Sequence, residues 1–144
     1  WRARYAVLAA LVIGGLTAGL SAIGLAILFG LDKAMIAAIA PKSVTAPVAM
    51  GIAKSLGGPV SLAALLAVLT GITGAVMATP LFNAFGFSDW RGRGFAVGVT
   101  CHGIGTAHAF QISPVAGSFA TIGMALNALF SALILPVLYL GLPG

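Results

Sequence analysis

Residues Tyr5–Leu31 decide the fold of this protein, and they read YAVLAALVIGGLTAGLSAIGLAILFGL. The stretch contains no charged side chain over about 27 residues, which at ~1.5 Å per helical residue is enough to cross a ~30 Å hydrocarbon core with some tilt. It therefore predicts a membrane-spanning helix. The alternative is a secretory signal peptide, because Arg2 and Arg4 precede the run, but its apolar region would be about twice the usual length.

Two further apolar runs, Val60–Thr79 and Val115–Leu140, are also uncharged and long enough to span. Of the 144 residues, 60% are apolar and 6% are charged, whereas about a quarter of an ordinary soluble domain is charged. This composition excludes a soluble domain and predicts an all-α membrane protein. Because the chain begins without Met, we expect residues 1–144 to be a single transmembrane domain, the C-terminal part of a longer protein.

The net charge of +5 does not predict a nucleic-acid partner. The basic residues lie singly or in pairs at the edges of apolar runs, where Lys and Arg set the orientation of a protein in the lipid bilayer. Cys101 is the one cysteine, so no intrachain disulfide forms, and one Cys with two His cannot build a structural zinc site. We therefore expect no metal and no cofactor.

Signals of enzymatic chemistry are weak. Cys101 and His102 are neighbours in sequence and would point to different sides of a helix, so they make a poor nucleophile and base. Asp32 and Asp89 are the two carboxylates, and both fall in polar edges of apolar runs. Paired-carboxylate catalysis is therefore not expected, and we predict that the protein is not an enzyme.

Two segments are interrupted at the depth of the membrane. Ala34–Gly58 is broken by PKSVTAP at residues 41–47, and Gly94–Ser113 is broken by CHGIGT at residues 101–106. Each half is too short to cross a bilayer. Proline and glycine at membrane depth free backbone polar groups that lipid cannot satisfy, so such breaks must lie inside protein or beside a watery cavity.

The two breaks can be aligned by placing residues 45–47 on residues 106–108. In this alignment each break is followed by a half-helix and then by a full span, which suggests an internal repeat. If the first broken segment crossed fully, Arg91 and Arg93 would lie on the side opposite Arg4. If it enters and returns on one side, all three lie in the cytoplasm, as the positive-inside rule requires. The second topology predicts two re-entrant segments that form an inverted repeat, as in many secondary transporters.

Lys42 is the strongest candidate for a binding residue, since it lies at a helix break about ten residues from the polar edge at Asp32. A lysine at the centre of a membrane helix costs ~2.5–3.5 kcal/mol on insertion scales, and an anionic ligand would offset that cost. Ser43 and Thr45 stand where N-cap hydroxyls belong, with Pro47 in the first turn of the next half-helix. Alternatively, Lys42 snorkels to an interface and marks a helix end.

The second break contributes the remaining candidates. Thr106 is expected to cap the second half-helix, whose N-terminus favours anions, as Thr45 does at the first break. Gly103 and Gly105 would let a ligand approach the backbone. We expect the two breaks to form one site.

Three polar residues have two interpretations each. His102 and His108 could donate to a carboxylate or exchange protons, or they could be satisfied by backbone carbonyls inside a helix bundle. Asn127 lies within a full span, where an amide is more often a contact between helices than a ligand contact. Gly15-x-x-x-Gly19 and Gly94-x-x-x-Gly98 are expected to be packing faces.

The sequence resembles the LrgB/CidB family over nearly the whole chain, at PKSVTAPVAM (41–50), RGFA (93–96) and HGIGTA (102–107). Members are often labelled antiholin-like, and a similar domain occurs in the plastid glycolate/glycerate translocator, while bacterial relatives are linked to pyruvate uptake. The resemblance implies a bacterial inner-membrane transporter of small 2-hydroxy or 2-oxo monocarboxylates. The alternative that it implies is an antiholin-like protein that regulates murein hydrolase export and lysis.

The chain departs from the family at three positions: the family usually has Ser at Cys101, Thr or Ser at Ala46, and Arg at His108. If that Arg holds the carboxylate, this protein either depends on Lys42 and the helix ends or needs a protonated His108, and binding should weaken at alkaline pH. The resemblance also implies a homo-oligomer or a complex with a small membrane protein of the LrgA/CidA type.

Overall fold

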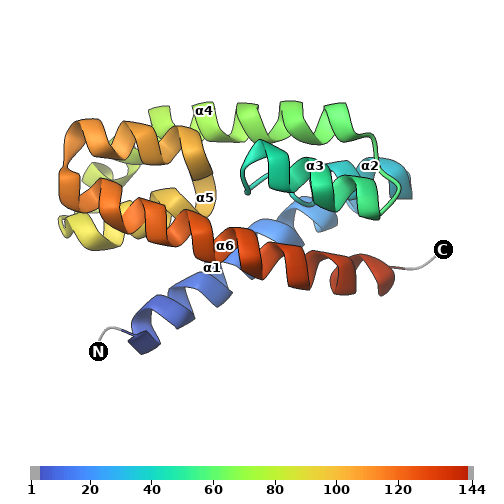
Figure 1. Cartoon of the computed structure of the whole chain (residues 1–144), viewed down its shortest axis with the longest axis horizontal. Coiled ribbons are helices and arrows are strands. Elements are labelled where there is room, and N and C mark those ends of the chain that lie inside the picture. Colours follow the sequence, from blue (N-terminus) through green and yellow to red (C-terminus); the bar gives the residue numbers. More distant parts are fainter. Residues whose placement is uncertain (1–3, 143–144) are drawn as a thin grey trace.

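The computed structural model describes residues 4–142, which fold into six α-helices without a strand (Figure 1). The helices are α1 (Arg4–Leu28), α2 (Lys33–Ile39), α3 (Ala46–Ser55), α4 (Val60–Ala84), α5 (Trp90–Ile112) and α6 (Pro114–Leu140). Helices α1, α4 and α6 are long and apolar enough to cross a membrane. The predicted all-α architecture with three spans is therefore confirmed.

The three long helices run between the same two ends of the molecule. At one end, Ala6 of α1 lines a cavity together with Arg91 of α5. At the other end, the Tyr139 hydroxyl of α6 donates to the Lys33 carbonyl, with an O–O distance of 3.1 Å. The beginning of α1 and the beginning of α5 thus share one end, as the charge pattern predicts for Arg4 and Arg91, whereas Arg2 lies outside the described residues.

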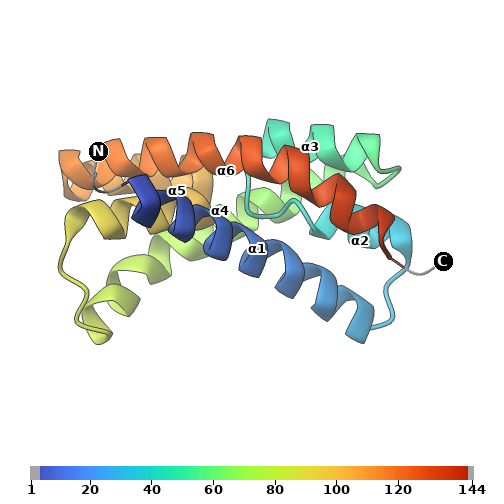
Figure 2. The same ribbon diagram turned by 90° about the horizontal axis from the view of Figure 1, so that it is seen from below.

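Helices α2 and α3 form a first hairpin at the end where α6 finishes (Figures 1 and 2). Asp32 caps α2 by accepting a hydrogen bond from the Met35 amide at 2.8 Å. The turn at residues 41–45 reverses the chain, and a Cβ on Gly58 would lie 2.7 Å from the Cβ of Ala37. The chain thus returns to the level at which α2 began, and the predicted first break is confirmed.

Helix α5 is a second hairpin, at the end where α6 begins. His102 has φ 42° and ψ −132°, outside the helical region, and separates two halves of α5. The halves lie side by side, since a Cβ on Gly105 would come within 2.8 Å of Val97 Cγ1. The predicted break over residues 101–106 is thus reduced to His102 alone, because Gly103 and Gly105 both adopt helical geometry in the second half.

Small residues let the helices approach closely. In the Gly15-x-x-x-Gly19 face, added Cβ atoms would lie 2.8 Å from Phe130 and 2.9 Å from Leu135 of α6. In the Gly94-x-x-x-Gly98 face, a Cβ on Gly98 would collide with the backbone of Ala120. Both predicted packing faces are confirmed, and they bring α1 and α5 against α6.

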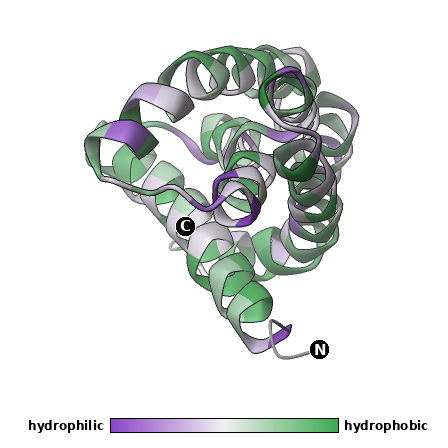
Figure 3. Cartoon of the chain, turned by 90° about the vertical axis from the view of Figure 1, so that its left-hand side faces the viewer, coloured by the Kyte–Doolittle hydropathy of each residue, from purple (hydrophilic) through white to green (hydrophobic). Residues whose placement is uncertain are grey.

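Hydrophobic residues make up most of the helices (Figure 3), and many of the large apolar side chains are exposed. Leu69 and Val76 of α4 are 50% and 67% exposed, and Leu129 and Leu133 of α6 are 66% and 72% exposed. A protein in water would not present so many large apolar side chains, whereas in a bilayer they contact lipid at no cost.

Candidate functional site

A cavity of about 760 Å³ lies between α1, α4 and α5, beside the turn of the first hairpin. Most of its wall is apolar, as expected at the depth of a membrane. Polar side chains from four parts of the chain interrupt that wall: Thr17, Lys42, Ser43, Thr70, Thr73, Thr100 and Cys101. We refer to it as the Lys42 cavity.

Lys42 is held in a tight turn at the edge of this cavity. Its own amide donates to the Ile39 carbonyl at 3.1 Å, and the half-buried ammonium donates to Ser43 Oγ at 3.2 Å. Within residues 4–142 the one ion pair joins Arg91 to Asp89 at the surface, so no carboxylate of the described chain neutralises Lys42. The cavity is therefore bordered by a positive charge that has no counter-charge in this part of the protein.

The depth of Lys42 follows from its contact with α6. The carbonyl of Ser43 accepts a hydrogen bond from Asn127, which lies thirteen residues from either end of α6 (127 − 114 and 140 − 127). At ~1.5 Å per residue, each end of that long apolar helix is ~20 Å away along its axis. The turn that carries Lys42 is thus level with the middle of α6, a helix long and apolar enough to span a membrane.

Asn127 connects the two breaks. The side chain is 2% exposed, and its Nδ2 donates to the carbonyls of Ser43 and Val99, each at 2.9 Å. Its Oδ1 accepts from Ser131 at 3.4 Å. Asn127 is not among the residues that line the Lys42 cavity, so the structure supports its interpretation as a contact between helices.

The His102 ring forms its hydrogen bond with a backbone carbonyl of another helix, as the second of its two interpretations predicts. Its Nε2 lies 2.8 Å from the carbonyl oxygen of Ala67 in α4, and the residue is 3% exposed. The ring fits against Gly71, where a Cβ would lie 2.7 Å from His102 Cε1. One turn along α4, Gly74 makes room for Cys101 in the same way. These glycines form a recess that receives the second break.

The predicted caps are partly wrong. Thr45 is the N-cap residue of α3, with Pro47 in the first turn, as predicted, but its hydroxyl makes no capping hydrogen bond. Ser43 is not a cap, because its oxygen instead accepts from Lys42 and lines the cavity. Neither Thr45 nor Pro47 lines that cavity, so the N-terminus of α3 does not face it.

The glycine-rich part of the second break also differs from the prediction. Thr106 lies inside the second half of α5, where its hydroxyl donates to the His102 carbonyl at 2.7 Å, so it does not cap a helix. Gly105 is a packing position, since a Cβ there would collide with Cys101. Gly103 is exposed and lies outside the Lys42 cavity, and a Cβ there would meet a single neighbouring atom, at 4.0 Å.

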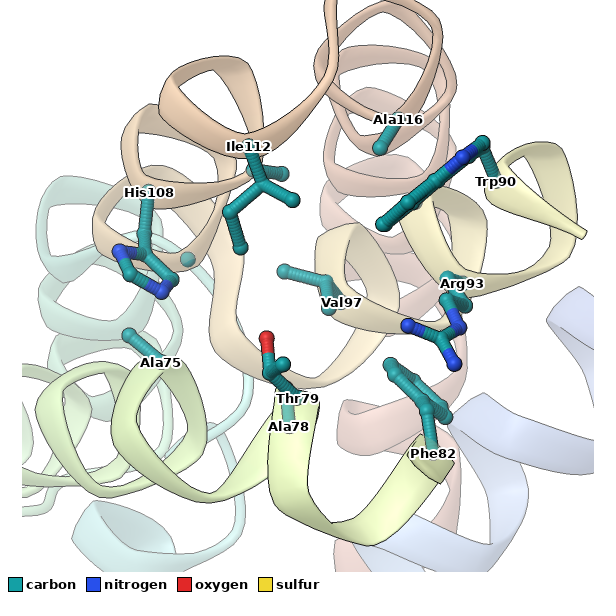
Figure 4. A pocket seen from close by; sticks show the side chains of 13 residues that line it. Ala75, Ala78, Thr79, Phe82, Trp90, Arg93, Val97, His108, Ile112 and Ala116 are labelled. Atoms are coloured by element: carbon teal, nitrogen blue, oxygen red, sulfur yellow. The ribbon is translucent and has the colours of Figure 1, made fainter. Parts of the chain in front are cut away.

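His108 lines a different cavity, of about 20 Å³, which is room for about one water molecule (Figure 4). His108 and Arg93 lie on opposite sides of this small cavity. The guanidinium of Arg93 is held by the Phe87 carbonyl at 2.6 Å and by Asn83 Oδ1 at 2.7 Å. The two predicted breaks therefore do not form one site that includes His108.

Sequence reasoning missed the hydroxyl groups of the Lys42 cavity. Thr100 donates to the Ala96 carbonyl at 2.8 Å, whereas Thr17, Thr70 and Thr73 have no hydrogen-bond partner among the described residues. Their hydroxyls are free to bind a ligand or water. Thr70 and Thr73 are three residues apart on one face of α4, and this spacing was the available signal.

The fold and the cavity define an integral membrane protein in which apolar helices border an open cavity with a cation at its edge. The chain belongs to the LrgB-like family, whose family model matches residues 2–140. With its three apolar spanning helices, it is an integral protein of a bacterial membrane.

Curated relatives agree with this assignment. The chain is 34% identical over 113 residues to the holin-like protein CidB of Staphylococcus epidermidis, and the alignment covers 78% of this chain and 49% of the relative. It is 31% identical over 133 residues to an uncharacterized protein of Haemophilus influenzae, an alignment that covers 92% of this chain and 58% of the relative. It is 32% identical over 108 residues to the uncharacterized protein YwbG of Bacillus subtilis, an alignment that covers 75% of this chain and 48% of the relative. The chain thus spans about half the length of the relatives it matches. No solved structure matches it.

Proposed function

We propose that this protein carries small 2-hydroxy or 2-oxo monocarboxylates, of the glycolate, glycerate or pyruvate type, across the membrane. The observation that carries the proposal is the Lys42 ammonium, which borders a cavity at mid-depth without a carboxylate partner among residues 4–142. Such a charge is costly to keep there, and a substrate carboxylate supplies the missing counter-charge.

The other polar groups of the cavity suit the rest of such a substrate. Thr17, Thr70 and Thr73 offer hydroxyls from two helices, and a hydroxyl both donates and accepts. A 2-hydroxyl donates or accepts and a 2-oxo group only accepts, so both find partners on this wall.

The arrangement of the hairpins favours transport with two alternating openings. The first hairpin starts and ends near the C-terminal end of α6, and the second starts and ends near its N-terminal end. Both turns approach Asn127 at the middle of α6. Two re-entrant hairpins that enter from opposite faces are the plan of inverted-repeat carriers, which place their substrate at the meeting point.

Uptake by proteoliposomes tests this function. With the full-length protein, we expect uptake of labelled glycolate to saturate and to be competed by unlabelled pyruvate, because both bind one site. Trapped sucrose should stay inside the vesicles, since a carrier that alternates between two openings never forms a continuous pore. Uptake that rises linearly with glycolate, without competition, would contradict a carrier.

The second candidate is an antiholin-like protein that controls lysis, alone or with a small LrgA/CidA-type partner. It is favoured by the name holin-like that the staphylococcal relatives carry. A pore-forming assembly would release the trapped sucrose, and a purely regulatory assembly would transport neither solute. The same vesicles therefore separate the candidates.

His108→Ala is expected to change the KM for glycolate by less than about twofold relative to the unmodified protein, at acidic as well as at alkaline pH. The reason is that His108 faces the small cavity with Arg93 and does not line the Lys42 cavity. Of the two alternatives that the sequence leaves open, this prediction follows the one in which Lys42, and not a protonated His108, holds the carboxylate. Uptake of both proteins, measured from acidic to alkaline pH, checks this prediction. If the KM of the unmodified protein varies with pH and the KM of His108→Ala does not, His108 has a role in binding after all.

A further inference from the structure

Asn127 is the single side chain that bonds both hairpin turns within residues 4–142. The first tip, residues 41–45, presents the Ser43 carbonyl, and the second tip, residues 99–103, presents the Val99 carbonyl; Asn127 Nδ2 donates to both at 2.9 Å. Both bonds join segments far apart in sequence. They use the two hydrogens of one carboxamide, so the groups cannot separate without losing a bond.

Both carbonyls need a partner from outside their own helix. The first half of α5 ends at the His102 break, so its last carbonyls lack the amides that a continuing helix would supply. The Ser43 carbonyl lies in the turn between α2 and α3, before Thr45 begins the next helix. At membrane depth, water does not replace these partners and an unsatisfied carbonyl is costly.

The Asn127 amide also fixes the position of the substrate-binding charge. Ser43, whose backbone it holds, follows Lys42 and accepts a hydrogen bond from the Lys42 ammonium at 3.2 Å. The second tip contributes Thr100 and Cys101 to the wall of the same cavity. The distance between the charge and that wall is therefore set through Asn127.

We propose that Asn127 is a positioning residue for transport: its carboxamide locks the two hairpin tips together and thereby aims Lys42 into the cavity. This inference rests on the proposed carrier function. It assigns Asn127 no contact with the substrate, so its effect on affinity must act through Lys42.

A double-mutant cycle tests that route. Asn127→Leu, close to Asn in size, is expected to raise the KM for glycolate about tenfold, as loss of interhelical hydrogen bonds at membrane depth allows. In the Lys42→Arg variant, the guanidinium already holds the charge in a different place from the ammonium. In that variant, Asn127→Leu should raise the KM for glycolate by less than about a further threefold. Ser131→Ala is the matched control, because it keeps both carbonyl bonds and removes the 3.4 Å contact with Asn127 Oδ1. Additive effects of the two substitutions would overturn the proposal.

Amide hydrogen exchange in nanodiscs provides a readout that needs no substrate. In Asn127→Leu, both tips should exchange about tenfold faster, whereas in Ser131→Ala neither should change. Asn127→Ala, which also removes both donor hydrogens and places no carboxylate near Lys42, serves if the Leu variant does not fold. Faster exchange in one tip alone, or in neither, refutes the lock. If the unmodified protein transports no glycolate, the carrier function fails, and hydrogen exchange still decides whether the lock exists.

Discussion

Replacing Lys42 by Ala is expected to lower the kcat/KM of glycolate uptake by about 100-fold while the protein still assembles. The ammonium borders the cavity at the level of the middle of α6, and no carboxylate among residues 4–142 shares it. A charge-assisted hydrogen bond contributes ~1.5–3 kcal/mol, and ~2.7 kcal/mol corresponds to 100-fold. Initial uptake rates in proteoliposomes at several glycolate concentrations measure the loss.

Lys54→Ala is the matched control for this substitution. Lys54 lies in the last turn of α3, is exposed, and does not line the cavity. It removes the same charge and should leave uptake within about twofold. Unchanged transport in Lys42→Ala, or a defect in assembly alone by size-exclusion chromatography, would favour the antiholin-like function over the carrier.

Gly98→Ala is expected to produce the largest loss of stability. A Cβ at this position would collide with the backbone carbonyl of Ala120 and lie 2.8 Å from the Met124 amide nitrogen. Backbone cannot rotate out of the way as a side chain can, so α5 must move away from α6. Overpacking of this kind costs typically ~1–3 kcal/mol, and a shift of two helices places this site at the upper end of that range. The thermal unfolding midpoint in detergent should fall markedly.

Gly51→Ala is the control for this second prediction. Gly51 lies inside α3, and a Cβ there would meet no atom within 4 Å. Ala is better than Gly in a helix by ~0.8–1.0 kcal/mol, so this variant should unfold at the same temperature as the unmodified protein or slightly higher. If Gly98→Ala unfolds as late as Gly51→Ala, the close contact between α5 and α6 is incorrect.

The spans were predictable because their signal is local. A run of apolar residues as long as the bilayer is thick needs no knowledge of the rest of the chain, and Val115–Leu140 corresponds to α6 within one residue. The end of α4 was less accurate. The predicted span stops at Thr79, whereas the helix continues through Pro80 to Ala84, because hydropathy marks the edge of the apolar run and not the end of the hydrogen-bonded helix.

The second break illustrates what the sequence does not contain. Glycines at 103 and 105 suggested where the backbone would leave the helix, yet the positive φ falls on His102. Its ring bonds the Ala67 carbonyl and fills the space above Gly71. Those contacts come from a helix more than thirty residues away, so tertiary structure overrides the local preference of glycine.

The candidate site was predictable only where a single residue has a high free-energy cost of insertion into the membrane. Lys42 could be identified from the expense of a charge within an apolar segment. Thr17 and Thr100 are ordinary residues of membrane helices, and only the packing of α1 and α5 brings them to one cavity. The same packing separates His108 from Lys42, which their similar positions beside the two breaks did not indicate.

The glycine recess on α4 limits which substitutions the contact between α4 and α5 can accept. Gly74 has no side chain where Cys101 needs space, and Gly71 has none where His102 needs it. Bulk at one position of each pair therefore requires compensation at the other. A side chain added at Gly71 or Gly74 should therefore be tolerated only when His102 or Cys101 is replaced by a smaller residue.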